Sequence, residues 1–270
     1  MSARMMNVAI AGASGRMGRV LIETVSRAPD ARLAAALEQS GNPYVGKDAG
    51  ELFEEARGVS ISDDIEHALS GCDVLIDFTR PDGTVRHLAV CRTLGVKLVI
   101  GTTGFDDSQK QAIAEAAREV PIAMAPNFSV GVNAAFRLIE VAAKALGDGY
   151  DIEIVEAHHR HKVDAPSGTA LRMGEIVAGA LNRDLKTCAV YDRHGDTGER
   201  NSQTIGFSSV RGGDIVGDHT VMFLGTGERV EITHRAASRD TYAQGALRSA
   251  RFLLGKKSGL YDMQDVLGLR

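Results

Sequence analysis

A run of basic side chains occupies the segment HHRHKVD, which extends from His158 to Asp164. Each of its first five residues is basic or can become so, and Asp164 supplies a single negative charge. Neighbouring like charges depress one another's protonation unless a counter-charge lies among them. We therefore expect either a solvated loop or a site whose missing negative charge arrives with an anionic ligand.

The residues after this run have the pattern of a helix. Small and apolar residues recur at helical spacing, at Ala170, Gly174, Val177 and Leu181. The pattern predicts a helix that begins near Thr169, with Ser167 or Thr169 as its N-cap. The backbone amides of Gly168 and Thr169 would then point outward and bind an anion. Because a basic run and a helix N-terminus converge here, we predict a site for a small molecule with two carboxylates.

Proton transfer is the chemistry that these side chains favour. An imidazole titrates near pH ~6.5 and is a natural proton donor, which an adjacent lysine can assist. The alternatives are a solvated turn, a loop that binds only phosphate, and a metal site built from His158, His159 and His161. We expect no metal, because adjacent cations and the lack of a thiolate or a nearby pair of ligating carboxylates disfavour one.

A second motif, GASGRMG, follows the first apolar run of the chain. Gly12, Gly15 and Gly18 would let the backbone turn tightly and approach a pyrophosphate at a helix N-terminus. Ser14 occupies the usual place of the middle glycine, so a simple tight turn remains the alternative. Glu38 ends the next apolar run, where a carboxylate can accept hydrogen bonds from both ribose hydroxyls of an adenosine. The combination indicates a dinucleotide site.

Two later segments fit the same site. They are GTTG, from Gly101 to Gly104, and APNF, from Ala125 to Phe128. Each follows a predicted strand, and ligands of open α/β sheets bind beyond the carboxyl ends of the strands. Taken alone, either segment could equally be a turn.

The arrangement of these motifs predicts two domains. Short apolar runs alternate with amphipathic segments over residues 1–129, which indicates βαβ units and a doubly wound parallel sheet of the Rossmann type. Later strands are expected in TIGFSSVRG, DHTVMFLG and RVEITHRAAS, and they should pair antiparallel because no long helix separates them. We expect a dinucleotide-binding domain of residues 1–129 plus 240–270. Residues 130–239 would form an inserted α+β domain with an open mixed sheet, for substrate binding and oligomerisation.

Composition narrows the possible partners and compartment. The 270-residue chain has a formal net charge of −4, which argues against nucleic acid or an anionic membrane as a partner. No apolar run reaches the ~18 residues needed to span a bilayer. The start of the chain superficially mimics a signal peptide, but its glycines fit the dinucleotide motif better. The cysteines Cys72, Cys91 and Cys188 form neither a disulfide framework nor a zinc pattern, so we expect a cytoplasmic protein.

Five segments of the chain resemble the 4-hydroxy-tetrahydrodipicolinate reductase family of the diaminopimelate route to lysine: EAHHRHKVDAPSGTA, GASGRMG, DFTRPDGT, GTTGF and NFSVGVN. The resemblance covers essentially the whole chain. It implies a cytoplasmic homotetramer that uses NADH or NADPH. It also implies reduction of a cyclic, imine-bearing dicarboxylate with loss of water.

The resemblance implies roles for individual residues as well. His158 matches the family's proton donor and acceptor, and Lys162 matches its second proton donor. The positions that match substrate contacts are His159, Gly168 and Thr169. The positions that match dinucleotide contacts are Gly12, Ala13, Ser14, Gly15, Arg16, Met17, Glu38, Gly101, Thr102, Thr103, Ala125, Pro126, Asn127 and Phe128.

The chain departs from the family pattern at two positions. Gln39 stands where many relatives have an arginine that meets the 2′-phosphate of NADPH. In the glycine loop only Arg16 is placed to meet that phosphate, so we expect a preference for NADH. Pro126 removes one amide donor from its segment, so a contact there must use its carbonyl or packing.

Two other classes of protein share part of this pattern. An aldehyde dehydrogenase of the aspartate-semialdehyde type has the same two-domain plan but needs a thiolate nucleophile, and the cysteines lie outside every motif above. A dinucleotide-sensing regulator should carry a DNA-binding element with a basic recognition helix, and none is visible in the sequence.

Overall fold

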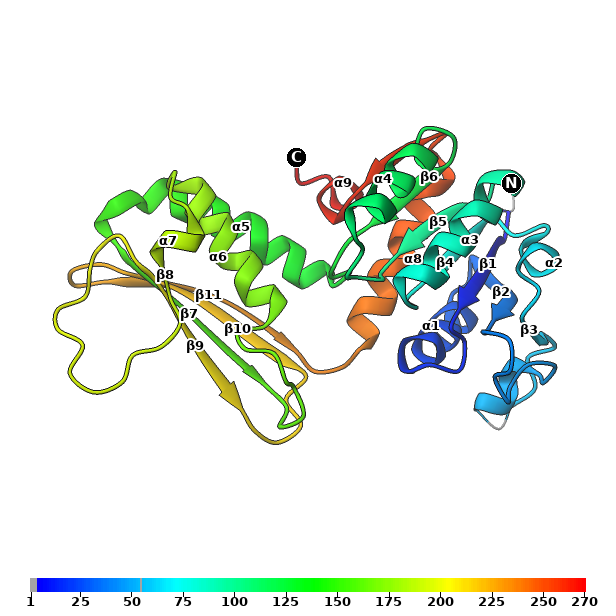
Figure 1. The fold of residues 1–270 in the computed structure, drawn as a ribbon, viewed down its shortest axis with the longest axis horizontal. Coiled ribbons are helices and arrows are strands. Elements are labelled where there is room, and N and C mark those ends of the chain that lie inside the picture. Colours follow the sequence, from blue (N-terminus) through cyan, green and yellow to red (C-terminus); the bar gives the residue numbers. More distant parts are fainter. Residues whose placement is uncertain (1–3, 54) are drawn as a thin grey trace. The chain divides into compact units, whose positions relative to one another are not determined.

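The chain folds into two compact units (Figure 1). The computed structural model describes residues 4–53 and 55–270. Unit 1 contains the residues up to Val130 together with Arg239–Arg270, and unit 2 contains Gly131–Ser238. The first three residues of the expected domain 1–129 lie outside the described residues. In the described part of the chain, no helix combines the length and the apolar character needed to cross a membrane.

Unit 1 is built on a seven-stranded sheet in which all strands run parallel, in the order β12-β6-β5-β4-β1-β2-β3. Val74, Leu75 and Ile76 of β4 are fully buried, as expected where helices cover both faces of a parallel sheet. The strands are β1 (Met6–Ala11), β2 (Ala31–Leu37), β3 (Ile61–Ser62), β4 (Val74–Asp77), β5 (Lys97–Ile100), β6 (Pro121–Met124) and β12 (Gly259–Tyr261). The predicted doubly wound sheet is confirmed, and the C-terminal tail completes it through β12.

Helices pack on both faces of this sheet and form two apolar cores. Val8 and Ile10 of β1 pack in a core with α1 and α8, whereas Ala9 and Ala11 pack in a second core with α3 and α4. This division follows the alternation of side chains along a strand. The helices are α1 (Arg16–Arg27), α2 (Ile65–Leu69), α3 (Pro81–Leu94), α4 (Asp107–Ala116), α8 (Asp240–Leu254) and α9 (Met263–Leu267), with a short 3₁₀ helix η1 (Ala49–Leu52).

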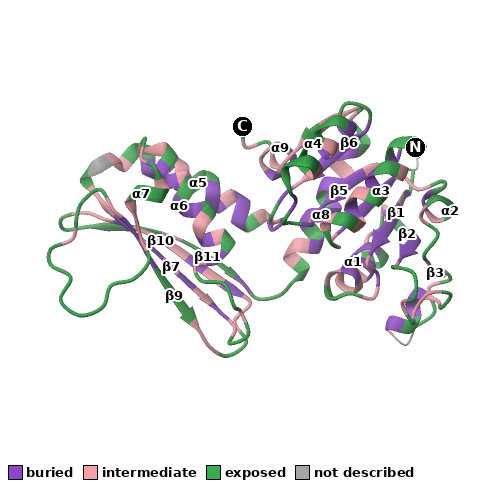
Figure 2. Ribbon diagram, in the orientation of Figure 1, coloured by how far each residue is buried: buried purple, intermediate pink, exposed green. Residues whose placement is uncertain are grey.

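Unit 2 carries a mixed five-stranded sheet in the order β11-β10-β7-β9-β8. Alternate residues of β7 are buried, and Ile152 and Ile154 pack in one core with Phe136 of α5 and Met173 of α6 (Figure 2). The elements are α5 (Val130–Leu146), η2 (Gly147–Gly149), β7 (Asp151–His158), α6 (Gly168–Ala180), α7 (Leu185–Cys188), β8 (Ala189–Val190), β9 (Ile205–Arg211), β10 (Gly217–Leu224) and β11 (Arg229–Ala236). The expected open mixed sheet is confirmed.

The expected strand pairing in unit 2 is only partly right. β10 pairs antiparallel with β11, as predicted. β9 does not pair with β10: it pairs in parallel with β7, while β10 pairs antiparallel with the other side of β7. The physical reason is α6, which supplies the crossover connection that a parallel pair requires. The short turns that follow β9 carry no signal for this pairing, because the helix that permits it precedes β9.

Candidate active site

A glycine loop joins β1 to α1 in unit 1. Gly12 has a φ of 67°, in the left-handed region that glycine adopts easily. A Cβ atom on Gly18 would lie 2.1 Å from the carbonyl oxygen of Gly12, so glycine is required for the close approach of α1 to the loop. Gly15 is the N-cap of α1 and has no side chain to engage the first-turn amides. This arrangement suits the binding of a pyrophosphate.

Glu38 follows β2 and is hydrogen-bonded to the glycine loop. Its Oε1 accepts hydrogen bonds from the backbone amide and the hydroxyl of Ser14, at 2.9 and 2.6 Å. Its Oε2 accepts a longer bond of 3.2 Å from the amide of Gln39. The structure therefore brings two of the predicted cofactor elements together. Of the other predicted loop residues, Ala13 is buried, Met17 is half-buried and Arg16 is exposed.

A cavity of about 670 Å³ opens beside Glu38. Its lining includes the predicted Gly12, Ser14, Gly15 and Glu38, and also Gln39, Asn42, Phe78, Thr79, Arg80, Arg86 and His87. Arg16 does not line it, and the expectation that Arg16 meets a 2′-phosphate stays a prediction. β1 pairs with both β2 and β4, so the segment after β4 brings Arg80 and Arg86 to the end of β2.

A buried carboxylate organises the wall of this cavity. Asp77 ends β4 and is fully buried. Its Oδ1 accepts hydrogen bonds from the amide and hydroxyl of Thr79 at 2.9 and 2.6 Å, and its Oδ2 lies 2.7 Å from Nδ1 of His87. Burial raises the pKa of Asp77, but His87 and Thr79 outweigh it and hold the pKa below its usual value. The hydroxyl of Thr102, which accepts a bond from Thr84, lies 3.4 Å from the same Oδ1. The side chain of Thr102 thus supports the wall.

The segments after β5 and β6 pack against this wall. A Cβ atom on Gly101 would lie 2.2 Å from the ring of Phe78. That ring packs against Phe128 with centroids 5.6 Å apart. Phe128 is buried in the core. Of the other predicted positions, Ala125 is buried, Asn127 is half-buried, and Thr103 and Pro126 are exposed.

In unit 2, His158 ends β7 and is almost completely buried. Its Nδ1 lies 2.6 Å from Oε2 of Glu156, which is two residues earlier on the same face of the strand. Burial lowers the pKa of His158, and Glu156 acts in the opposite direction. The net shift is downward, so the imidazole is mostly neutral at neutral pH.

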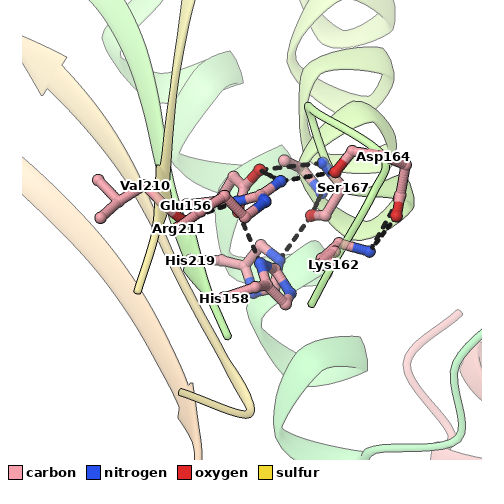
Figure 3. A network of polar contacts seen from close by, with 9 residues as sticks. Glu156, His158, Lys162, Asp164, Ser167, Val210, Arg211 and His219 are labelled. Carbon is pink, nitrogen blue, oxygen red and sulfur yellow. Dashed lines mark hydrogen bonds and ion pairs between the residues drawn. The ribbon is translucent and has the colours of Figure 1, made fainter. Parts of the chain in front are cut away.

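Glu156 is ionised because a guanidinium pairs with both of its oxygens (Figure 3). Arg211 of β9 donates to Oε2 at 2.8 Å and to Oε1 at 2.7 Å. Burial alone would raise the pKa of Glu156, but Arg211 and other hydrogen bonds lower it to about 2. A bidentate charged pair of this kind is the form in which a carboxylate tolerates burial.

The N-terminus of α6 lies beside this pair (Figure 3). Ser167 is the N-cap, and its Oγ accepts a hydrogen bond from the amide of Ala170 at 3.2 Å. The predicted helix start and one of the two predicted caps are therefore confirmed. Gly168 and Thr169 are the first two helical residues, and a Cβ atom on Gly168 would meet nothing within 4 Å. The helix N-terminus therefore leaves room for a ligand.

The rest of the basic run forms a turn after β7. The amide of Lys162 donates to the carbonyl of His159 at 3.1 Å, and the amide of His159 donates to Ile215 at 2.8 Å. The ammonium of Lys162 lies 2.7 and 2.8 Å from the two carboxylate oxygens of Asp164. The structure thus brings His158, Lys162 and the start of α6 into one neighbourhood, as the sequence predicts.

Sequence reasoning did not assign roles to three partners of His158. Glu156 could have been found, because it shares a strand face with His158. Arg211 and His219 belong to β9 and β10 and have no local signal that connects them with His158. His219 lies edge-on to the ring of His158, with centroids 5.0 Å apart, and its Nε2 is 2.9 Å from the hydroxyl of Ser167.

The cysteines do not have the properties of a nucleophile. Burial raises the pKa of Cys72 to about 11, and it raises the pKa values of Cys91 and Cys188 as well. Since the thiolate is the reactive form, the aldehyde dehydrogenase alternative is not supported. Within residues 4–53 and 55–270, no group of three or more His, Cys, Asp or Glu side chains could hold a metal ion.

Comparisons with known proteins agree over the full length of the chain. A family model described as dihydrodipicolinate reductase, N-terminus, matches residues 6–128, and one described as dihydrodipicolinate reductase, C-terminus, matches residues 131–267. The chain is 64% identical to 4-hydroxy-tetrahydrodipicolinate reductase from Nitrosomonas europaea, over 98% of this chain and 99% of that protein. It is 65% identical to the enzyme of the same name from Cupriavidus necator, over 98% of this chain and 100% of that protein.

A solved structure is also similar to this chain. Dipicolinate-bound dihydrodipicolinate reductase from Paenisporosarcina sp. TG-14 is 26% identical, with a TM-score of 0.79 over 97% of this chain and 99% of that one. Both family models and this solved structure carry the name dihydrodipicolinate reductase, and the two relatives carry the name 4-hydroxy-tetrahydrodipicolinate reductase. The chain therefore belongs to the dihydrodipicolinate reductase family.

Proposed function

We propose that this chain reduces 4-hydroxy-tetrahydrodipicolinate with NADH or NADPH, with loss of water, to give tetrahydrodipicolinate in the diaminopimelate route to lysine. The observation that carries the proposal is the buried imidazole of His158, held at 2.6 Å by Glu156 beside the N-terminus of α6. The names of the relatives and the dipicolinate of the solved structure support a small cyclic dicarboxylate as substrate. We also propose a cytoplasmic homotetramer, on the basis of the family resemblance.

The residues of unit 1 fit a dinucleotide. The first-turn amides of α1 would bind the pyrophosphate, and Oε2 of Glu38 would accept a bond from a ribose hydroxyl. When bound, the reduced nicotinamide supplies a hydride to C4 of the dehydrated, conjugated ring. The proposed contacts are Gly12, Ala13, Ser14, Gly15, Arg16, Met17, Glu38, Gly101, Thr102, Thr103, Ala125, Pro126, Asn127 and Phe128.

The residues of unit 2 would hold the substrate and supply the proton. Gly168 and Thr169 would bind one carboxylate with the helix N-terminus, and His159 in the basic turn would bind the other. The ring that accepts a hydride must also accept a proton. His158 would donate that proton, and Lys162 would act as a second donor that keeps the site electropositive.

We predict a higher kcat/KM with NADH than with NADPH. Glu38 would repel the 2′-phosphate, and Gln39 offers amide hydrogen bonds without charge. Arg80 and Arg86, which also line the cavity, would give partial compensation. A charged hydrogen bond contributes about 1.5–3 kcal/mol. Gln39→Arg should therefore shift the preference toward NADPH by about tenfold or more.

Steady-state kinetics with both cofactors at fixed ionic strength test this prediction. Arg80→Ala is the matched variant, and it should reduce kcat/KM with NADPH more than with NADH. If the wild type prefers NADPH and Arg80→Ala removes that preference, Arg80 supplies the charge that Gln39 lacks, and the prediction is wrong.

We predict that a planar pyridine dicarboxylate competes with the substrate. Its two carboxylates would meet the basic turn and the amides of Gly168 and Thr169. Thr169→Val should weaken its binding by about 1 kcal/mol, or roughly fivefold in Kd, if a hydroxyl bond to a carboxylate is lost. Titration calorimetry measures both effects, with Thr187→Val in α7 as the control. An unchanged Kd for Thr169→Val would remove Thr169 from the site.

The proposed reaction can be tested directly. Substrate made enzymatically from pyruvate and aspartate semialdehyde is supplied with NADH or NADPH, and cofactor oxidation is followed by absorbance. Oxidation that depends on both the substrate and the chain supports the function. If neither NADH nor NADPH is oxidised, the proposed function is contradicted.

A further inference from the structure

We propose that Glu156 is a positioning residue that selects Nε2 of His158 as the nitrogen that exchanges the proton, and that ties this imidazole to the N-terminus of α6. The inference rests on the proposed function, in which His158 is the proton donor. Glu156 is not among the predicted site residues, and Nε2 of His158 is the atom that would exchange the proton.

The charge of Glu156 determines which nitrogen of His158 carries hydrogen. Its carboxylate is buried, with 1% of its surface exposed, and Arg211 pairs with both oxygens. A carboxylate in this state only accepts hydrogen bonds. Nδ1 of His158, at 2.6 Å from Oε2, must therefore carry hydrogen whether the imidazole is neutral or protonated. The proton that changes place must then be on Nε2.

Nε2 of His158 lies close to the start of β10. A Cβ atom on Gly217, at the start of β10, would lie 3.0 Å from Nε2 of His158. Real Cβ atoms seldom come so close, so glycine at this position lets β10 approach the imidazole without a side-chain clash. The nitrogen selected by Glu156 therefore faces a position where the strand carries no side chain.

Glu156 also links His158 to the anion site. Oε1 of Glu156 accepts a hydrogen bond of 3.2 Å from the amide of Ser167. Ser167 is the N-cap of α6, and its hydroxyl also lies 2.9 Å from Nε2 of His219. One carboxylate thus holds both the imidazole and the residue that precedes the Gly168 and Thr169 amides. Displacing it would disturb the proton donor and the substrate anchor together.

The groups that face His158 predict the effect of removing this charge. Lys162 of the turn and Arg211 of β9 disfavour the protonated imidazole, and Glu156 favours it. Another neighbour, His219 of β10, is buried, and burial lowers its pKa to about 4, so it is neutral at neutral pH. Without the carboxylate, His158 would face two cations and burial. Its protonated form would become less stable.

The test compares Glu156→Gln with Glu153→Gln, a control on the same strand whose carboxylate pairs with Arg193 and Arg200 instead. A proton donor is active below its pKa, so kcat falls as the pH rises through that pKa. Glu156→Gln should move this fall to lower pH by about one unit or more. It should also lower kcat at neutral pH by about tenfold or more and weaken dicarboxylate binding. Glu153→Gln should leave the pH of the fall unchanged.

Two further results decide the matter if Glu156→Gln does not fold. Nitrogen-15 spectra of histidine-labelled wild type report the tautomer of His158, assigned by comparison with His158→Gln. Hydrogen on Nδ1 supports the inference, and a neutral ring with hydrogen on Nε2 overturns it. Normal turnover in His158→Gln would instead overturn the proposed proton donor. Where Glu156→Gln does fold, an unshifted pH profile in this variant together with reduced turnover in His158→Gln would overturn only the role of Glu156.

Discussion

Replacing His158 by glutamine is expected to lower kcat by about a hundredfold or more, the range for loss of a positioned proton donor. Glutamine is polar and of similar reach but cannot exchange a proton near neutral pH. His158 ends β7 in unit 2, and the cavity beside Glu38 belongs to unit 1. The Kd of the reduced cofactor should therefore change little, and the loss should appear in kcat.

The control for this substitution lies in the turn that follows β7. His161 is exposed, and His161→Gln should keep kcat within about twofold if position, and not the number of imidazoles, determines the effect. Steady-state kinetics give kcat, and fluorescence titration of the reduced cofactor gives its Kd. Near-normal turnover in His158→Gln would show that another group donates the proton.

Lys162→Ala is expected to lower kcat by a similar factor, about a hundredfold. The ammonium pairs with both oxygens of Asp164, and Asp164 is largely exposed. A substrate carboxylate could therefore replace Asp164 as the partner of Lys162. With substrate bound in this way, Lys162 would supply positive charge and a second proton beside His158.

Two further variants separate the charge of Lys162 from its proton. Lys162→Arg keeps the charge, but an arginine does not release its proton in proteins, so kcat should stay low if proton donation matters. Lys186→Ala, at an exposed position of α7, controls for loss of a cation from unit 2. Full activity in Lys162→Arg would reduce the role of Lys162 to electrostatics.

Local patterns were sufficient to predict most of the fold. Apolar runs such as those of β1 and β4 are continuous because helices cover both faces of the parallel sheet, and the alternation in β7 reflects one covered face. The position of β9 was not predictable in the same way. Its partner β7 lies far away in sequence, and the choice between β7 and β10 depends on how α6 connects the strands.

The residues of the candidate site also fall into two groups: some are indicated by short motifs, and others are brought to the site only by the order of the strands. The glycine loop, Glu38, His158 and the cap of α6 lie in short segments whose residue types carry the signal. Arg80 lines the cavity and Arg211 pairs with Glu156 because of the strand order, which becomes known only with the sheet. The role of Arg16 beside the 2′-phosphate stays a prediction from the glycine loop alone.

The most direct test of the proposed reaction follows the hydrogen that passes from the reduced cofactor to the substrate. Reduced nicotinamide cofactor that carries deuterium at the transferable position is oxidised by the wild-type chain in ordinary water, with enzymatically made substrate, and the product is analysed by mass spectrometry. The proposed function predicts one deuterium per product molecule, bound to ring carbon C4, and an equal amount of oxidised cofactor. Product without deuterium, or substrate that remains unreduced while the cofactor is bound, would contradict it.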